Sequence, residues 1–260
     1  MHTSNEYDFI FSIGEDCACT GYLRKHNLQN FSYPFDWLTK ASFESRIDLL
    51  VNDFKDFLNP EDIKFLPKNP ELNNDPNYDY YENIRTGFYF YHDFPANSDL
   101  LVNLNVVEEK YARRINRLYK HIAEAQTILI VWLSRDKFID ENRLKVAYEK
   151  IDSKFPDKNI DFLILENDSN RKPNECECVS VTDNIKKYVY DNASYDYSNP
   201  MAECMGNIEQ TSKIFDNYKM NVKLKVLIEN KIKMVLGKFI ALFIPTRSLR
   251  RRFKDKWCNL

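Results

Sequence analysis

Apolar residues along this chain fall into short continuous runs that alternate with longer stretches of helical spacing. Three of the runs predict buried strands, at residues 8–13, 127–133 and 160–165. Continuous apolar runs are typical of parallel strands, which helices cover on both faces. An aromatic run at residues 87–91 predicts a further strand, and residues 179–181 are a candidate edge strand.

Helical spacing of the apolar residues predicts helices at residues 17–26, 42–52, 107–125 and 140–152. The stretch from residue 59 to residue 83 is rich in Pro, Asn and Asp, and its length suggests a lid or a binding loop. Because strands and helices alternate, we expect an α/β fold with a mostly parallel central sheet flanked by helices.

The charges divide the chain into two parts. Residues 213–260 hold 13 Lys and Arg against 3 Asp and Glu, whereas the preceding residues hold 24 and 36. We therefore expect a catalytic-type α/β domain over residues 1–212 and a basic helical tail over residues 213–260, with a helix at residues 222–236.

The tail combines the apolar segment 239–244 with six basic residues between positions 247 and 256. This combination favours an anionic membrane surface as partner, with a cytoplasmic body held peripherally on an inner membrane. A core helix with a solvated end and RNA affinity are the alternatives. We expect no nucleic-acid partner, because no recognition module is visible and the net charge of the chain is −2.

Composition excludes several protein classes. Hydrophobic residues make up 43% of the chain, so a large core can form, and six cysteines are too few for a disulfide scaffold. The two C-x-C pairs lack zinc-site spacing, and the first six residues do not resemble a signal peptide, so we expect reduced thiols in the cytoplasm. No apolar run is long enough to cross a membrane. Glycine-rich nucleotide loops are absent, and we expect no cofactor.

The strongest chemical signal is the stretch from Ser12 to Cys17. An apolar strand ends at Gly14, and after Glu15 and Asp16 a cysteine stands where the next helix begins. Backbone amides and the helix dipole at such a position stabilise a thiolate and can hold an oxyanion. The adjacent carboxylates oppose thiolate formation. A small buried structural role is the alternative for Cys17.

A cysteine nucleophile needs a base, and the chain has four histidines. His2 lies near the terminus, His26 ends the helix that Cys17 begins, and His121 lies on a charged helix where we expect it to be solvated. His92 ends the aromatic strand beside Asp93. If that strand pairs with residues 8–13, Cys17 and His92 meet at one sheet edge, where α/β proteins bind ligands. A structural hydrogen bond to Asp93 is the alternative.

Asp36 follows Pro34 and stands between the aromatic residues Phe35 and Trp37, which predicts a partly buried carboxylate with a partner. It could orient His92, accept a hydrogen bond from a ligand hydroxyl, or cap a neighbouring helix. For the substrate side we select Gly14, Asp16, Trp37, Arg113 and Arg114 as candidates, since the two arginines could bind an anionic saccharide.

These motifs resemble those of the putative papain-like cysteine peptidase family of bacteria. The resemblance rests on Ile13-Gly14-x-x-Cys17, on the later Ser32-Tyr33-Pro34-Phe35-Asp36-Trp37, and on His92-Asp93-Phe94. The resemblance implies a Cys17 nucleophile, a His92 base and an orienting acid at Asp36 or Asp93. It also implies a link to surface-polysaccharide loci, where the family's members tend to occur.

Two function classes follow. The first is a cysteine-dependent acyl-transfer enzyme, which is either a peptidase or amidase, or an acyltransferase that uses acyl-CoA. The pattern also resembles capsule-locus acetyltransferases, in which a Gly-Asn-Cys turn follows the first strand. The second class is a non-catalytic or glycosyltransferase-like glycan-assembly protein with a structural Cys17. The substrate is expected to be a glycan or a peptide.

Overall fold

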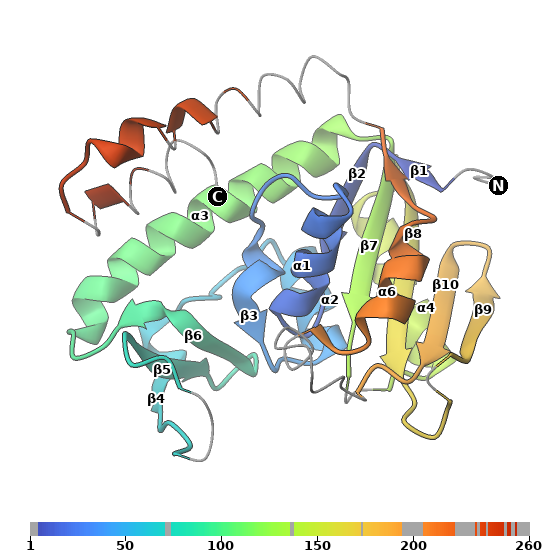
Figure 1. The fold of residues 1–260 in the computed structure, drawn as a ribbon, viewed down its shortest axis with the longest axis horizontal. Helices are drawn as coiled ribbons and strands as arrows, with labels where there is room; N and C mark the ends of the chain where they lie inside the picture. Colours follow the sequence, from blue (N-terminus) through green and yellow to red (C-terminus); the bar gives the residue numbers. More distant parts are fainter. Residues whose placement is uncertain are drawn as a thin grey trace.

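The chain folds as a mixed α/β protein in which a five-stranded sheet lies beside a second, antiparallel sheet (Figure 1). The computed structural model describes residues 5–70, 74–135, 138–172, 174–193 and 205–221, together with part of the stretch from 232 to 253. The helices and 3-10 turns of these regions are α1 (Cys17–Lys25), η1 (Pro34–Trp37), α2 (Phe43–Val51), η2 (Pro60–Asp62), α3 (Leu100–Glu124), α4 (Glu141–Lys154) and α6 (Ile208–Phe215).

The central sheet is mixed rather than mostly parallel, which corrects the prediction. Its strands follow the spatial order β2 (Phe9–Ser12), β7 (Thr127–Leu133), β8 (Asn159–Asn167), β10 (Ile185–Tyr190) and β9 (Cys176–Thr182). The first four run parallel to their neighbours, but β9 pairs antiparallel with β10. Only Asp183 and Asn184 separate these two strands, and a connection of two residues permits only antiparallel pairing.

The second sheet is wholly antiparallel and has the order β3 (Leu38–Thr39), β6 (Phe88–Pro95), β5 (Tyr78–Asn83) and β4 (Ile63–Leu66). Two of its strands and η2 occupy residues 59–83, where we expected one long loop. The strand predicted at residues 87–91 exists as β6, but it pairs with β3 and β5, not with β2. The expected meeting of β6 and β2 at one sheet edge is therefore wrong.

The chain returns to its amino-terminal end after α6. There β11 (Lys219–Met220) pairs in parallel with β1 (Glu6–Tyr7). The predicted division between residues 212 and 213 falls within α6, whose Ile214 and Phe215 are buried in the core. The predicted helix at residues 222–236 lies almost wholly outside the described residues.

Side chains alternate across the central sheet and bury both of its faces. Phe11, Ile130 and Phe162 belong to the core beneath α2, α3 and α4. Ile10 and Leu163 point to the opposite face, which α1 and α6 cover. This arrangement explains why the strands appear as continuous apolar runs. No helix in the described part of the chain is long and apolar enough to span a membrane.

Candidate active site at the start of helix α1

The loop between β2 and α1 continues along β7 and carries Cys17 to the carboxyl end of the sheet. The amide of Ile13 donates to the carbonyl of Val131 at 2.8 Å, and the amide of Glu15 donates to the carbonyl of Leu133 at 3.0 Å. Helix α1 then begins at Cys17 (Figure 1). Ligands of open α/β sheets bind at this end of the strands, so the predicted position of Cys17 is suited to chemistry.

Gly14 is explained by packing. A Cβ at this position would lie 2.3 Å from the Cβ of Cys19, closer than two carbon atoms can approach. The Gly14 amide donates to the Ser12 hydroxyl at 2.9 Å, which closes the turn. Gly14 therefore lets α1 approach the end of β2 and thereby sets the position of Cys17.

Two cysteines on the first turn of α1 have different surroundings. Cys17 is half-buried, whereas Cys19 is fully buried and its thiol contacts the carbonyl of Val131 at 3.7 Å. Burial raises the pKa of Cys19 to about 12, so its thiolate is not populated near neutral pH. Only Cys17 combines partial exposure with a position at the helix start.

The two carboxylates that precede Cys17 are both engaged by donors. Asp16 caps α1 by accepting from the amide of Ala18 at 2.8 Å, and its other oxygen pairs with the guanidinium of Arg135. Glu15 accepts from the hydroxyl of Ser134 at 2.6 Å and from the amide of Arg135 at 3.4 Å. The negative charge that opposes thiolate formation at Cys17 is therefore partly balanced by Arg135.

Asp36 is fully buried, and its carboxylate caps η1 and bonds this turn to α1. It accepts from the hydroxyl of Thr20 at 3.0 Å, from the side chain of Gln29 at 2.8 Å and from the amide of Tyr33 at 2.9 Å. Burial raises the pKa of Asp36, although the guanidinium of Arg24 opposes the shift from 3.6 Å. Asp36 therefore joins η1 to α1, the least chemical of the three expected roles.

His92 lies in β6 of the antiparallel sheet. Its side chain is exposed, and its ring stands edge-on to Tyr78 on the neighbouring strand β5 at 5.8 Å. Because β6 pairs with β3 and β5 and not with β2, the pairing of His92 with Cys17 stays a prediction that rests on sequence alone.

Asp93 is buried and turned toward α3 instead of toward His92. Its carboxylate pairs with Lys110 and accepts from the hydroxyl of Tyr111 at 3.3 Å. These contacts attach β6 to α3. The expectation that Asp93 orients His92 has no support in this geometry.

The other two described histidines also contact groups outside the loop of Cys17. His26 lies 2.9 Å from the carboxylate of Asp216. His121 is not solvated as expected: its Nδ1 lies 2.7 Å from the hydroxyl of Tyr33, and burial lowers its pKa. The rings of Phe9 and Phe31 also pack against this imidazole. His2 lies outside the described residues.

Apart from Gly14 and Asp16 in the loop of Cys17, the predicted substrate residues lie on η1 and α3. Trp37 ends η1, and the guanidinium of Arg24 lies 5.9 Å from the centre of its ring. On α3, Arg113 is exposed, whereas Arg114 is buried and stands over the ring of Tyr111. Arg24 lies two turns from Cys17 along α1, and Thr20, which stands between them on that side of the helix, is buried against Asp36.

Sequence reasoning missed three residues that shape this loop. Ser134 and Arg135 directly follow the apolar strand β7, and polar residues at the carboxyl end of a buried strand are a signal that could have identified them. The third is Arg46 on α2, which is fully buried and donates to the carbonyl of Glu15 at 3.0 Å. Nothing in its local sequence distinguishes it from a surface arginine.

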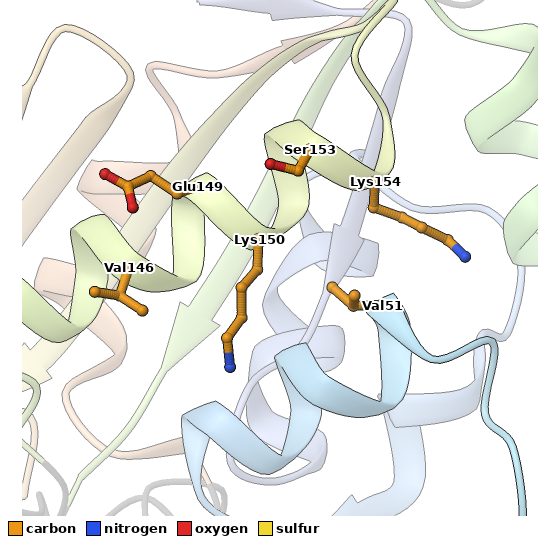
Figure 2. A pocket seen from close by; sticks show the side chains of 6 residues that line it. All are labelled: Val51, Val146, Glu149, Lys150, Ser153 and Lys154. Carbon is orange, nitrogen blue, oxygen red and sulfur yellow. The ribbon is translucent and has the colours of Figure 1, made fainter.

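A surface depression lies away from this loop, between the end of α2 and α4 (Figure 2). Lys150 on its rim pairs with Asp48 of α2, and Lys154 pairs with Asp53, which lies just after α2. We therefore interpret this depression as part of the packing contact between α2 and α4. Within the described residues, no group of three or more His, Cys, Asp and Glu side chains could hold a metal ion.

The chain is similar to a viral protein and to one protein family. An uncharacterized protein of Acanthamoeba polyphaga mimivirus is 25% identical over 190 residues, which cover 68% of this chain and 78% of the viral protein. No solved structure matches the chain. A family model described as a putative papain-like cysteine peptidase matches residues 8–170. This region contains the loop of Cys17, all of β6, and Ser134 and Arg135 after β7. That match supports a cysteine-dependent, hydrolase-like role, and this chain belongs to the putative papain-like cysteine peptidase family.

Proposed function

We propose that this chain is a cysteine-dependent hydrolase whose nucleophile is the thiolate of Cys17. The observation that carries the proposal is the contrast on the first turn of α1. Cys17 is half-buried at the carboxyl end of the sheet, whereas Cys19 is buried with its pKa raised to about 12. A single helix thus supplies a reactive position and an inert one.

The electrostatics of the loop support thiolate formation. The amino end of a helix carries partial positive charge, which favours an anion at its first residue. Asp16 would oppose this effect, but Arg135 pairs with its carboxylate. A thiolate stabilised in this way attacks without first transferring its proton to a histidine, so the proposal does not depend on His92.

In the proposed reaction the Cys17 thiolate adds to the carbonyl carbon of an amide or ester. The carbonyl oxygen becomes an oxyanion that backbone amides at the start of α1 can stabilise. When this intermediate collapses, the C–N or C–O bond breaks and the leaving group departs with a proton from solvent, which replaces the one that the Cys17 thiol released on ionisation. Water then attacks the thioester, releases a carboxylic acid and restores the thiol.

For the substrate we propose an acyl compound on a peptide or a glycan, bound at the start of α1 beside Cys17. Arg24 near the end of α1 and Trp37 of η1 lie together and are candidates for contact with a more distant part of the substrate. A guanidinium beside an indole suits an anionic or sugar-like group. Acyl transfer from acyl-CoA to a glycan would use the same acyl-enzyme, and the geometry favours neither acceptor.

The test is acyl-enzyme trapping with turnover. The full chain is incubated with a panel of activated esters, peptide amides and acyl-CoA, and intact mass and peptide mapping follow. We expect an acyl adduct on Cys17 and release of acid, both lost in Cys17→Ala and kept in Cys178→Ala, which removes an exposed thiol on β9. An adduct on another cysteine, or turnover that survives in Cys17→Ala, would contradict the proposal. A parallel incubation of acyl-CoA with an added glycan acceptor tests the transferase alternative, for which acylated glycan would form in place of acid.

A further inference from the structure

The carboxyl-terminal segment presents large apolar side chains to solvent. Its described residues between 232 and 242 are helical, and in Figure 1 they lie at the periphery, beyond α3. Phe239, Leu242 and Phe243 are 60%, 68% and 75% exposed. The other large apolar side chains exposed between residues 232 and 243 are Ile232, Val235, Leu236 and Ile240. Patches of this kind on a protein surface mark interaction sites.

The small residues of this helix are the buried ones. Ala241 is fully buried, and Gly237 one turn before it is also buried. At about 100° per residue the large apolar side chains span an arc of roughly 160°, and Gly237 and Ala241 lie outside that arc. A helix that belonged to the core would turn its large apolar side chains inward. This helix turns them toward solvent. Its apolar face is therefore available to contact another apolar surface, such as the acyl chains of a lipid bilayer.

The sequence beside this face is strongly basic. Residues 213–260 hold 13 Lys and Arg against 3 Asp and Glu, and six of the basic residues stand between positions 247 and 256. Of these six, Arg250 is described, and its guanidinium donates to the carbonyl of Ile244 at 3.0 Å, at the end of the apolar segment. A second copy of this tail would bring like charges together. Apolar side chains next to clustered cations complement the acyl chains and headgroups of anionic lipid.

We propose that residues 232–256 dock on the surface of an anionic lipid bilayer, with the apolar face of residues 235–243 inserted and the following basic residues at the headgroups. This inference rests on exposure and charge and is independent of the chemistry of Cys17. Neither element alone is sufficient, because stable peripheral binding needs two signals. Binding should therefore depend on anionic lipid, on ionic strength and on the exposed phenylalanines together.

The test is co-sedimentation of the full chain with vesicles of phosphatidylcholine, with or without phosphatidylglycerol. We expect binding to the anionic vesicles only, falling by about tenfold in high salt as screening shortens. Phe239→Asp with Phe243→Asp, and separately Arg251→Glu with Arg252→Glu, should each lower binding by at least about tenfold. The matched control is Phe65→Asp, because Phe65 is an exposed phenylalanine on β4, outside the tail. It should bind normally.

Three results would overturn the proposal. Equal binding to neutral and anionic vesicles would show that the basic residues do not drive binding. Full binding by the double phenylalanine variant would show that the apolar face is not inserted. Concentration-dependent self-association that the same variant abolishes, without vesicle binding, would show that a second copy covers this face. Circular dichroism of each variant confirms that the body remains folded.

Discussion

At the scale of single residues, the reactivity of Cys17 depends on a balance of charges within one turn of chain. Asp16 lies next to the thiol, and Arg135 pairs with Asp16 from the end of β7. The thiol therefore lies close to an ion pair, and removal of either partner leaves a single net charge beside it. The two removals should act on the thiol in opposite directions.

Asp16→Asn should lower the pKa of the Cys17 thiol, and Arg135→Gln should raise it. Asparagine caps helices as well as aspartate does, so Asp16→Asn should change the free energy of unfolding by less than about 0.5 kcal/mol. The pH dependence of the Cys17 alkylation rate measures both effects. Shifts in the same direction, or no shift in either variant, would show that this ion pair does not control the thiol.

The imidazole of His121 should make stability depend on pH. Burial lowers its pKa, so between that lowered value and about 6.5 the unfolded chain binds more protons than the folded chain. Stability contributed by neutral His121 is therefore present above about pH 6.5 and is lost as the pH falls toward the folded pKa. Urea midpoints at pH 5 and pH 7.5 should differ less in His121→Gln than in the unaltered chain. An equal difference would exclude His121 as the source.

At the scale of elements, close packing of α1 on the central sheet positions the candidate site. Gly14→Ala would place a Cβ 2.3 Å from the Cβ of Cys19 and should destabilise the fold by about 3 kcal/mol. Gly21→Ala on the same helix meets only the end of the flexible Met205 side chain at 3.2 Å and should be neutral or stabilise by up to about 1 kcal/mol. Urea unfolding of both variants measures this contrast, and equal effects would refute the packing role of Gly14.

The elements also show how far sequence reasoning reaches. Apolar runs predicted β2, β7 and β8, because each of these strands is buried on both faces. Sequence did not predict β5, whose Tyr, Asp and Asn residues appear polar, although its tyrosine rings pack against the rest of the second sheet. The strand β10 was also missed. Its Lys187 appears solvated in sequence, yet it is buried in an ion pair with Glu166.

Sequence also predicted one part of the candidate site and missed another. Local sequence placed Cys17 at the start of a helix, because a glycine turn after an apolar strand is a local signal. It could not place His92, since strand pairing is a property of the whole topology: β6 pairs with β3 and β5 in a separate sheet. Partners such as Arg135 and Arg46 are contacts between elements distant in sequence, which no local pattern records.

At the scale of the whole molecule, Arg46 joins the two sheets. Its guanidinium donates to the carbonyls of Glu15 in the β2–α1 loop and of Leu38 in β3, and it stands over the ring of Phe88 at 4.8 Å. Desolvation lowers the pKa of Arg46 to about 9, so its contacts must compensate for the loss of water. The loop of Cys17 and the second sheet are therefore held by one buried cation.

Arg46→Met should lower the free energy of unfolding by about 3 kcal/mol, because buried carbonyls then lose their donors. Arg143→Met is the matched control, since Arg143 is exposed on α4 and pairs with Glu44, and it should change stability by less than about 1 kcal/mol. Urea denaturation of both variants gives the comparison. A loss in Arg46→Met as small as in the control would show that the two sheets do not depend on this residue.

The measurement that tests the account most directly is the alkylation rate of each thiol in the full chain, by limited iodoacetamide treatment and peptide mapping at neutral pH. Cys176 and Cys178 are the internal references, since both are exposed and burial raises the pKa of Cys176. The account predicts that Cys17 reacts faster than either by on the order of tenfold, and that Cys19 reacts slowest. If Cys17 reacts no faster than Cys176 and Cys178, its thiol is structural and the hydrolase proposal is wrong.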